Sequence, residues 1–196
     1  MRLVLASASP ARAELLRQIG LRFDVVPSGI VEDTVGGDDL GESVAALALR
    51  KARHVSHTEH DALVIGADTV VVLDGEILGK PADADDARNM LRQMSGRWHQ
   101  VASGLAVVDS RSGLEASCYE ITQVLMADLS EEDIEGYVAT GEPLGKAGSY
   151  AIQGRGALLV ERISGCYFNV VGLPLARLVT LADTIGVDLM RTVFRG

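Results

Sequence analysis

The sequence predicts a mixed α/β fold in which helices flank a mixed β-sheet. Segment 62–78 holds two apolar runs joined by Asp74-Gly75, a dipeptide that favours a two-residue hairpin turn. Segments 99–108 and 117–127 form a second pair of long strand patterns, joined by the turn sequence DSRSG. A GxGxxG followed by a suitably placed acid is missing, so a regular doubly wound dinucleotide fold has little support.

The remaining elements follow from periodicity and from start and stop signals. Helices are predicted at 10–19, 43–55, 82–96, 130–141 and from Pro174 onward. Further strands are predicted at 3–6, 22–28, near 157–163 and near 167–171, with a polar loop at 31–42. Ser9 and Gly20 delimit the first helix, and Ser130 with Asp133 has the spacing of a capping box.

Composition narrows the class of protein. The 196 residues, 47% of them hydrophobic, fit one domain, 1–196, with a real core. A net charge of -9 and 4% aromatic residues disfavour binding to a nucleic acid polymer, which needs a basic face or stacking platforms. No apolar run approaches ~18 residues, the length that spans a membrane. The sequence therefore predicts a cytoplasmic protein that does not bind membranes.

The stretch LASASPARAELL, residues 5–16, places polar side chains where a strand turns into a helix. Ser9 is a natural N-cap, Pro10 a natural first helical residue, and Arg12 then lies in the first turn, where a cation works against the helix dipole. Serine hydroxyls (Ser7 and Ser9), free N–H groups and an arginine fork together can bind a phosphate. The alternative is an ordinary capped helix whose arginine extends into solvent.

Two polar residues interrupt the apolar run of segment 62–73. Asp68 in this position can orient a water or hold a metal, or it can be a strand-end aspartate bonded to backbone N–H groups. Thr69 follows it directly. Lys80, between Gly79 and Pro81, is either a fixed point charge for a phosphate or a solvated loop lysine.

Segment 145–156, GKAGSYAIQGRG, combines four glycines with Lys146 and Gln153. Glycines let a backbone approach a ligand closely, and the Gln153 amide can read a base edge as donor and acceptor. The alternative is a mobile loop before a bulged strand. Glu32 lies beside a polar loop, and its carboxylate suits Mg²⁺ or Mn²⁺.

Five motifs, taken together, resemble the Maf family. They are LASASPAR, GADTVVVLDGEILGKP, LRQMSGRWHQV, KAGSYAIQGRGA and VVGLPL, in the family's order and spread over essentially the whole chain. The resemblance implies an elongated, strongly twisted mixed sheet, with two lobes around a deep cleft, similar to the inosine-triphosphate pyrophosphatase (Ham1) fold. It also implies hydrolysis of nucleoside triphosphates between the α- and β-phosphates, a divalent metal (Mg²⁺, Mn²⁺ or Co²⁺) and a homodimer.

The same resemblance assigns roles to individual residues. Asp68 matches the catalytic carboxylate, and Glu32 matches an acid associated with the metal or water. Lys80 is expected to act in catalysis with these two acids, and the implied metal ligands are Glu32 and Asp68. The residues that match phosphate-binding or cleft positions are Ser9, Arg12, Lys51, Lys80 and Lys146. Thr69 and Gln153 match positions linked to base choice.

One position departs from the family's pattern. The usual motif reads SPRR, and its first arginine helps to mark the branch that acts on dTTP and UTP, whereas this chain has Ala11 there. GADT and AIQG still resemble that branch, which favours pyrimidine nucleotides, dTTP, UTP or CTP. Cleaning of non-standard nucleotides is a second possibility, and a non-catalytic nucleotide-binding regulator of cell division is the alternative from another class of protein.

Overall fold

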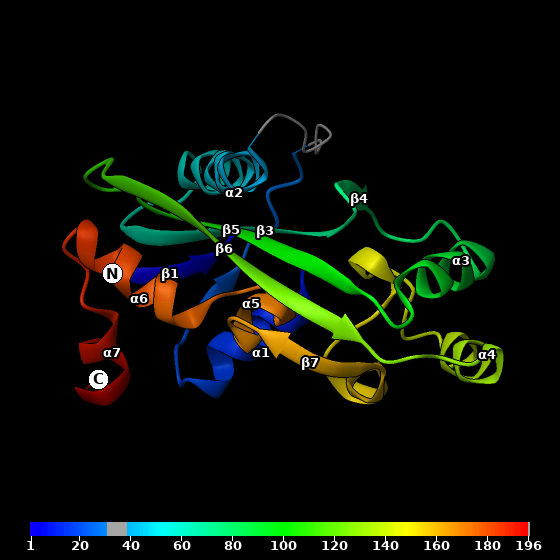
Figure 1. Ribbon diagram of the computed structural model, residues 1–196. Helices are drawn as coiled ribbons and strands as arrows, with labels where there is room; N and C mark the ends of the chain where they lie inside the picture. Colours follow the sequence, from blue (N-terminus) through cyan, green and yellow to red (C-terminus); the bar gives the residue numbers. More distant parts are fainter. Residues whose placement is uncertain (31–38, 196) are drawn as a thin grey trace. The chain divides into compact units, whose positions relative to one another are not determined.

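The computed structural model describes residues 1–30 and 39–195 of the chain (Figure 1). Its elements are β1 (Arg2–Leu5), α1 (Pro10–Gln18), β2 (Asp24–Val25), α2 (Leu40–Ser56), β3 (Ala62–Leu73), β4 (Glu76–Leu78), α3 (Ala84–Met94), β5 (Trp98–Asp109), β6 (Glu115–Met126), α4 (Glu131–Ala139), the 3₁₀ turns η1 (Ala147–Ser149) and η2 (Gly154–Leu159), β7 (Val160–Ser164), α5 (Tyr167–Val171), α6 (Leu175–Thr184) and α7 (Leu189–Arg195).

The strands form a seven-stranded sheet in the order β2-β1-β3-β5-β6-β7, with β4 paired to β3. β1 runs parallel to β2 and β3, whereas β4 is antiparallel to β3 and β7 antiparallel to β6. The predicted mixed sheet flanked by helices is therefore confirmed.

The chain divides into two compact units, which correspond to the two predicted lobes. Unit 1 comprises Met1–Asp68, Ser103–Glu120 and Gly172–Gly196, and unit 2 comprises Thr69–Ala102 and Ile121–Val171. The division falls within β3, β5 and β6. That residues 1–196 act as one domain stays a prediction.

In unit 1, α2 packs closely on the sheet through small residues. Its Ala48, Ala52 and Val55 share an apolar cluster with Val4 and Val64 of the strands. A Cβ at Gly66 would lie 2.2 Å from the Ala48 carbonyl oxygen, and one at Gly104 only 1.9 Å from that of Val44. Glycine at these two positions is what lets the helix backbone reach the strands.

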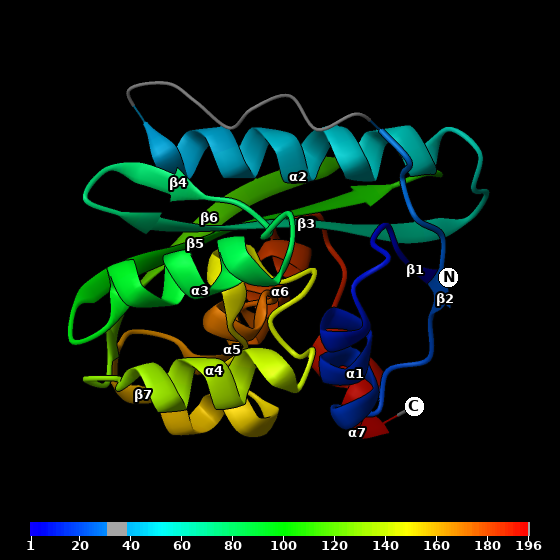
Figure 2. The ribbon, with the colours of Figure 1, turned by 90° about the vertical axis from the view of Figure 1, so that its right-hand side faces the viewer.

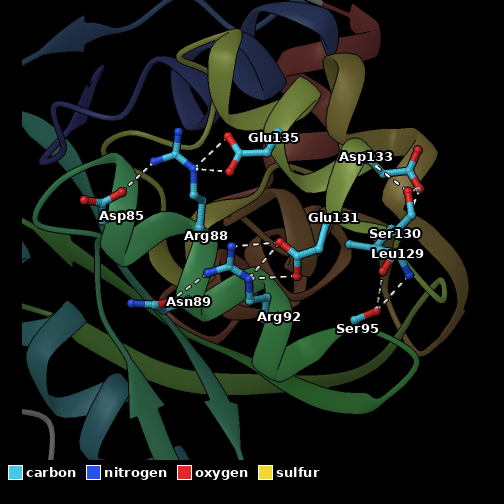
Figure 3. A network of polar contacts seen from close by, with 10 residues as sticks. All are labelled: Asp85, Arg88, Asn89, Arg92, Ser95, Leu129, Ser130, Glu131, Asp133 and Glu135. Carbon is cyan, nitrogen blue, oxygen red and sulfur yellow. Dashed lines mark hydrogen bonds and ion pairs between the residues drawn. The ribbon is translucent and has the colours of Figure 1, made fainter.

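In unit 2, α3 and α4 lie side by side (Figure 2). Their apolar faces meet in a core that includes Leu91, Met94, Ile134 and Val138. On the outside, Arg88 of α3 pairs with Glu135 of α4, and Arg92 with Glu131, each at 2.8 Å (Figure 3). These ion pairs are partly exposed, so each contributes at most about 1 kcal/mol, and the apolar contact is the main link between the helices.

Several local predictions are confirmed. Ser9 caps α1, and Gly20, with φ +79°, follows its last turn. Asp74 and Gly75 have φ values of 52° and 85°, the left-handed conformations that a two-residue hairpin turn requires. Ser130 and Asp133 form the reciprocal bonds of a capping box.

Three strand predictions were wrong in whole or in part. The strand expected at 22–28 is only the two residues of β2, and the strand expected near 157–163 begins at Val160, after η2. Segment 167–171 is helical, because buried Asn169 donates through Nδ2 to the Val101 carbonyl and to Thr122 Oγ1, both at 2.9 Å. Tertiary bonds here override the strand preference of a segment rich in aromatic and β-branched residues. Neither η1 nor α7 was anticipated.

Within the described ranges, none of the helices combines the length and apolarity needed to cross a bilayer.

Candidate functional site

The start of α1 has features that suit an anion. Ser9 Oγ accepts the backbone N–H of Arg12 at 3.4 Å, and Ser7 Oγ accepts that of Ser9 at 3.2 Å. The first turn carries no acidic residue, so the positive end of the helix dipole is not offset by its own side chains. Both predicted serines therefore lie where a phosphate can meet helix N–H groups.

The Arg12 guanidinium turns inward, not into solvent. Its Nε donates to the Gly172 carbonyl at 2.9 Å, and its Nη1 donates to Ser7 Oγ at 2.9 Å and to the Ala67 carbonyl at 3.0 Å. The side chain thus ties the helix start to β3 and to a residue 160 positions further along the chain. The alternative of a solvated arginine on a simply capped helix does not describe this residue.

Asp68 and Lys51 form a buried ion pair. Lys51 Nζ donates to Asp68 Oδ1 at 2.6 Å, and the two side chains are only 7% and 9% exposed. The close packing of α2 explains the pairing. Ala48 precedes Lys51 by one helical turn, and Gly66 precedes Asp68 by two strand residues, so the contact between Ala48 and Gly66 aligns the charged pair on the same faces.

Three predicted groups therefore meet at one point of β3. Arg12 bonds to the carbonyl of Ala67, and the next residue, Asp68, is paired with Lys51. A carboxylate that an ammonium holds in a fixed orientation can accept a proton, and a guanidinium bonded to the preceding residue can bind phosphate oxygens.

The other predicted residues lie in unit 2, mostly on loops. Thr69 is on β3, Lys80 follows β4 and is exposed, and Lys146 and Gln153 immediately precede η1 and η2. The Gly148 N–H donates to the Gly79 carbonyl at 3.0 Å, so the two lysine-bearing loops are joined backbone to backbone.

A buried pair of uncharged side chains anchors the loop that carries Lys146. Tyr150 and His99 meet at 2.7 Å between hydroxyl and Nε2, with their rings in an edge-on arrangement. Burial lowers the pKa of His99 to about 4 and raises the pKa of Tyr150. At neutral pH the ring is therefore uncharged, and it shares a hydrogen bond with the tyrosine hydroxyl.

Metal ligation has one described candidate. Glu32 lies outside the described residues, and in the part of the chain that the structure covers no group of three or more histidine, cysteine, aspartate or glutamate side chains could hold a metal. Asp68 alone still fits Mg²⁺, because this ion is commonly held by one or two carboxylates plus substrate phosphates. His54, His57 and His60 are exposed on or after α2.

Sequence reasoning missed the groups that hold these residues in place. Gly172 lies in the motif VVGLPL, and Tyr150 in GKAGSYAIQGRG, but neither motif reveals which atoms its backbone or hydroxyl binds. Glu142, whose carboxylate accepts the N–H groups of Arg155 and Gly156, was not singled out at all. The spacing of charged residues gave no signal for it, because its partners are backbone atoms.

Fold and site together define a mixed α/β protein with a serine-capped, arginine-bearing helix start and a buried lysine–aspartate pair. The chain matches the family described as Maf-like protein over residues 2–185, and it belongs to that family.

The curated relatives are similar over nearly their whole length. The chain is 50% identical to a protein of Pelotomaculum thermopropionicum named dTTP/UTP pyrophosphatase, over 96% of this chain and 98% of the relative. Proteins of the same name from Symbiobacterium thermophilum and Moorella thermoacetica are 53% and 52% identical, over 94% and 95% of this chain and 94% and 96% of the relatives. A solved Ham1 protein from Coxiella burnetii gives a TM-score of 0.46 at 14% identity, over 66% of this chain and 74% of that one.

Proposed function

We propose that this protein hydrolyses nucleoside triphosphates between the α- and β-phosphates, releasing a nucleoside monophosphate and pyrophosphate, with a preference for dTTP and UTP. The observation that carries the proposal is identity of about half over nearly the full chain to relatives named dTTP/UTP pyrophosphatase. The phosphate-binding helix start and the Lys51–Asp68 pair supply the groups that such a reaction needs.

The start of α1 binds the phosphates that leave. Ser7, Ser9 and the N–H group of Ala11 donate to phosphate oxygens, and the helix dipole favours their negative charge. Arg12 adds positive charge from a fixed position, because its bonds to Gly172, Ala67 and Ser7 hold the guanidinium in place. Stabilising the pyrophosphate in this way lowers the barrier to its departure.

Asp68 acts as the general base. Lys51 fixes one carboxylate oxygen, Oδ1, and the second, Oδ2, takes the proton of the water that attacks the α-phosphorus. A new bond forms between the water oxygen and the α-phosphorus, and the bond from that phosphorus to the bridging oxygen breaks. A divalent metal (Mg²⁺, Mn²⁺ or Co²⁺) would be held by Asp68 and Glu32 together with the phosphates, and it would supply charge neutralisation.

Unit 2 supplies recognition. Lys80 and Lys146 carry positive charge on two loops joined by the Gly148–Gly79 bond and neutralise phosphate oxygens. Thr69 and Gln153 read the base. Ala11, in place of the family's arginine, leaves room at the start of α1, and it makes activity on non-standard or purine nucleotides a second candidate function.

The names of the relatives do not favour a non-catalytic regulator of cell division, since they are names of enzymes. We further propose that the protein works in the cytoplasm as a homodimer, without binding membranes or nucleic acid polymers. The net charge of -9 supports the last point, since a polyanion is repelled by such a surface.

A product assay tests the proposed reaction. With Mg²⁺, Mn²⁺ or Co²⁺, we expect pyrophosphate release from dTTP and UTP to exceed that from dGTP or ITP, and Asp68→Asn to lower the rate by about 1,000-fold, as for loss of a general base. The matched control is Asp183→Asn, an exposed aspartate of α6, which should leave the rate unchanged. Release of orthophosphate, or an unchanged rate in Asp68→Asn, would contradict the proposal.

A further inference from the structure

The loop that carries Lys146 and Gln153 is closed at its base by one carboxylate. Glu142 stands just before the loop, and its two oxygens accept backbone N–H groups just after it. Oε1 accepts from Gly156 at 2.9 Å and Oε2 from Arg155 at 3.1 Å. The Glu142 side chain therefore joins the two ends of the loop, as a pair of strands does in a hairpin.

Tyr137 of α4 extends this connection into the loop. Its hydroxyl donates to Glu142 Oε1 at 3.0 Å and accepts the N–H of Ala151 at 3.2 Å. The backbone is therefore held on both sides of Gln153, two residues before it by the tyrosine and two and three residues after it by the glutamate.

Close packing around the turn shows that several residues, and not the polar Glu142 side chain alone, determine its conformation. A Cβ at Gly156 would lie 2.3 Å from the Ala151 carbonyl oxygen and 2.6 Å from the Tyr137 hydroxyl. At Gly154, with φ +67°, a Cβ would lie 2.9 Å from Glu142 Oε2. The two limbs of the turn touch each other, and Gln153 lies between them at the bend.

The charge of Glu142 suits this role. Burial alone raises the pKa of its carboxyl, but the N–H groups of Gly156 and Arg155 outweigh that effect and leave the pKa below its ordinary value. The carboxylate is thus ionised at neutral pH, and its bonds to the backbone are charge-assisted.

We propose that Glu142 and Tyr137 are positioning residues for base recognition: they fix the backbone on both sides of Gln153 and so fix the direction in which its amide meets the base. The inference rests on the proposed function, in which Gln153 reads the base. An amide discriminates between bases only if its donor and acceptor are held in register, because a mobile amide adapts to either pattern.

Base discrimination is the direct readout. The ratio of kcat/KM for dTTP to that for dGTP should fall about tenfold in Glu142→Ala, the equivalent of one well-made hydrogen bond. Tyr137→Phe keeps the ring in the core and removes only the hydroxyl, so it should lower the ratio in the same direction even if Glu142→Ala folds poorly. Glu132→Ala, an exposed glutamate of the same helix, is the matched control and should leave the ratio within about twofold.

A double variant separates positioning from a general loss of stability. If Glu142 acts through Gln153, then Glu142→Ala should change the ratio little once Gln153→Ala is present. Multiplying effects in the double variant, or an unchanged ratio in both Glu142→Ala and Tyr137→Phe, would overturn the inference.

Amide hydrogen exchange tests the same clamp without turnover. In Glu142→Ala the N–H groups of Arg155 and Gly156 should exchange about tenfold faster or more, and those of α3 should keep their rates. Unchanged exchange would overturn the inference even if the enzyme is active. If the unaltered protein releases no pyrophosphate from any nucleotide, the proposed function itself is wrong, and faster exchange then shows that the clamp exists without serving base choice.

Discussion

Each of the two compact units contains a buried polar pair of which the two partners lie almost equally far apart, but the two pairs differ in charge. In unit 1, Lys51 and Asp68 meet at 2.6 Å as an ion pair, and in unit 2, His99 and Tyr150 meet at 2.7 Å as neutral groups. The ionic pair joins helix α2 to strand β3, which also contacts the start of α1 through Arg12, whereas the neutral pair supports a loop.

This difference in charge bears on which of the two pairs can take part in a reaction. A carboxylate fixed by an ammonium can accept a proton, and it stays in place because both partners lie on regular elements. A histidine whose pKa is lowered to about 4 is uncharged at neutral pH, and its contact with Tyr150 can only hold the loop in place. Under the proposed function, unit 1 carries the fixed charges for the reaction and unit 2 the anchored loops for recognition.

Removing one partner of the ionic pair should have the largest effect on stability. Lys51→Met leaves the Asp68 carboxylate buried without its cation, and we expect the free energy of unfolding to fall by about 3–5 kcal/mol in urea titrations. The double variant Lys51→Met/Asp68→Asn buries no charge and should recover most of that loss. Equal losses in the single and double variants would mean that the pair is not desolvated as the structure shows.

Because of the neutral pair, the free energy of unfolding should depend on pH. Since the pKa of His99 is lowered to about 4 in the folded protein, against an ordinary value of 6.5, only the unfolded chain binds the proton between these limits. This stabilising contribution is complete above pH ~6.5 and is lost as the pH falls toward ~4, by up to about 3 kcal/mol.

The difference between the unfolding curves of the unaltered protein and His99→Gln isolates that contribution, because the glutamine does not titrate. His54→Gln, which replaces an exposed histidine of α2, is the control and should keep the slope of the unaltered protein. Parallel curves for the unaltered protein and His99→Gln would show that His99 titrates normally when folded.

The sequence predicts elements well where the determinants are local. Asp74-Gly75 fixes a hairpin turn by its own backbone preferences, and Ser130 with Asp133 closes a capping box within four residues. Segment 167–171 was mispredicted because the side-chain nitrogen of Asn169 donates hydrogen bonds to Val101 and Thr122, which are distant in sequence. Local propensity carries no information about such partners.

In the candidate site, too, the features set by local sequence were predictable and those set by tertiary packing were not. The serines and the arginine at the start of α1 are recognisable because a cap and a first turn are local features. That Arg12 reaches the Gly172 carbonyl, that Lys51 pairs with Asp68, and that Glu142 closes the Gln153 loop all depend on how distant segments pack. The functional roles of all the predicted site residues, in unit 1 as in unit 2, stay predictions.

The position of attack on the triphosphate tests the central claim most directly. When dTTP is hydrolysed in water enriched in heavy oxygen, attack on the α-phosphorus places the label in dTMP, and mass spectrometry of the two products reads it. We predict labelled dTMP and unlabelled pyrophosphate. In Asp68→Asn, labelled dTMP should form more slowly, by the same factor as pyrophosphate release. Label in the pyrophosphate, or release of labelled orthophosphate, would contradict the account.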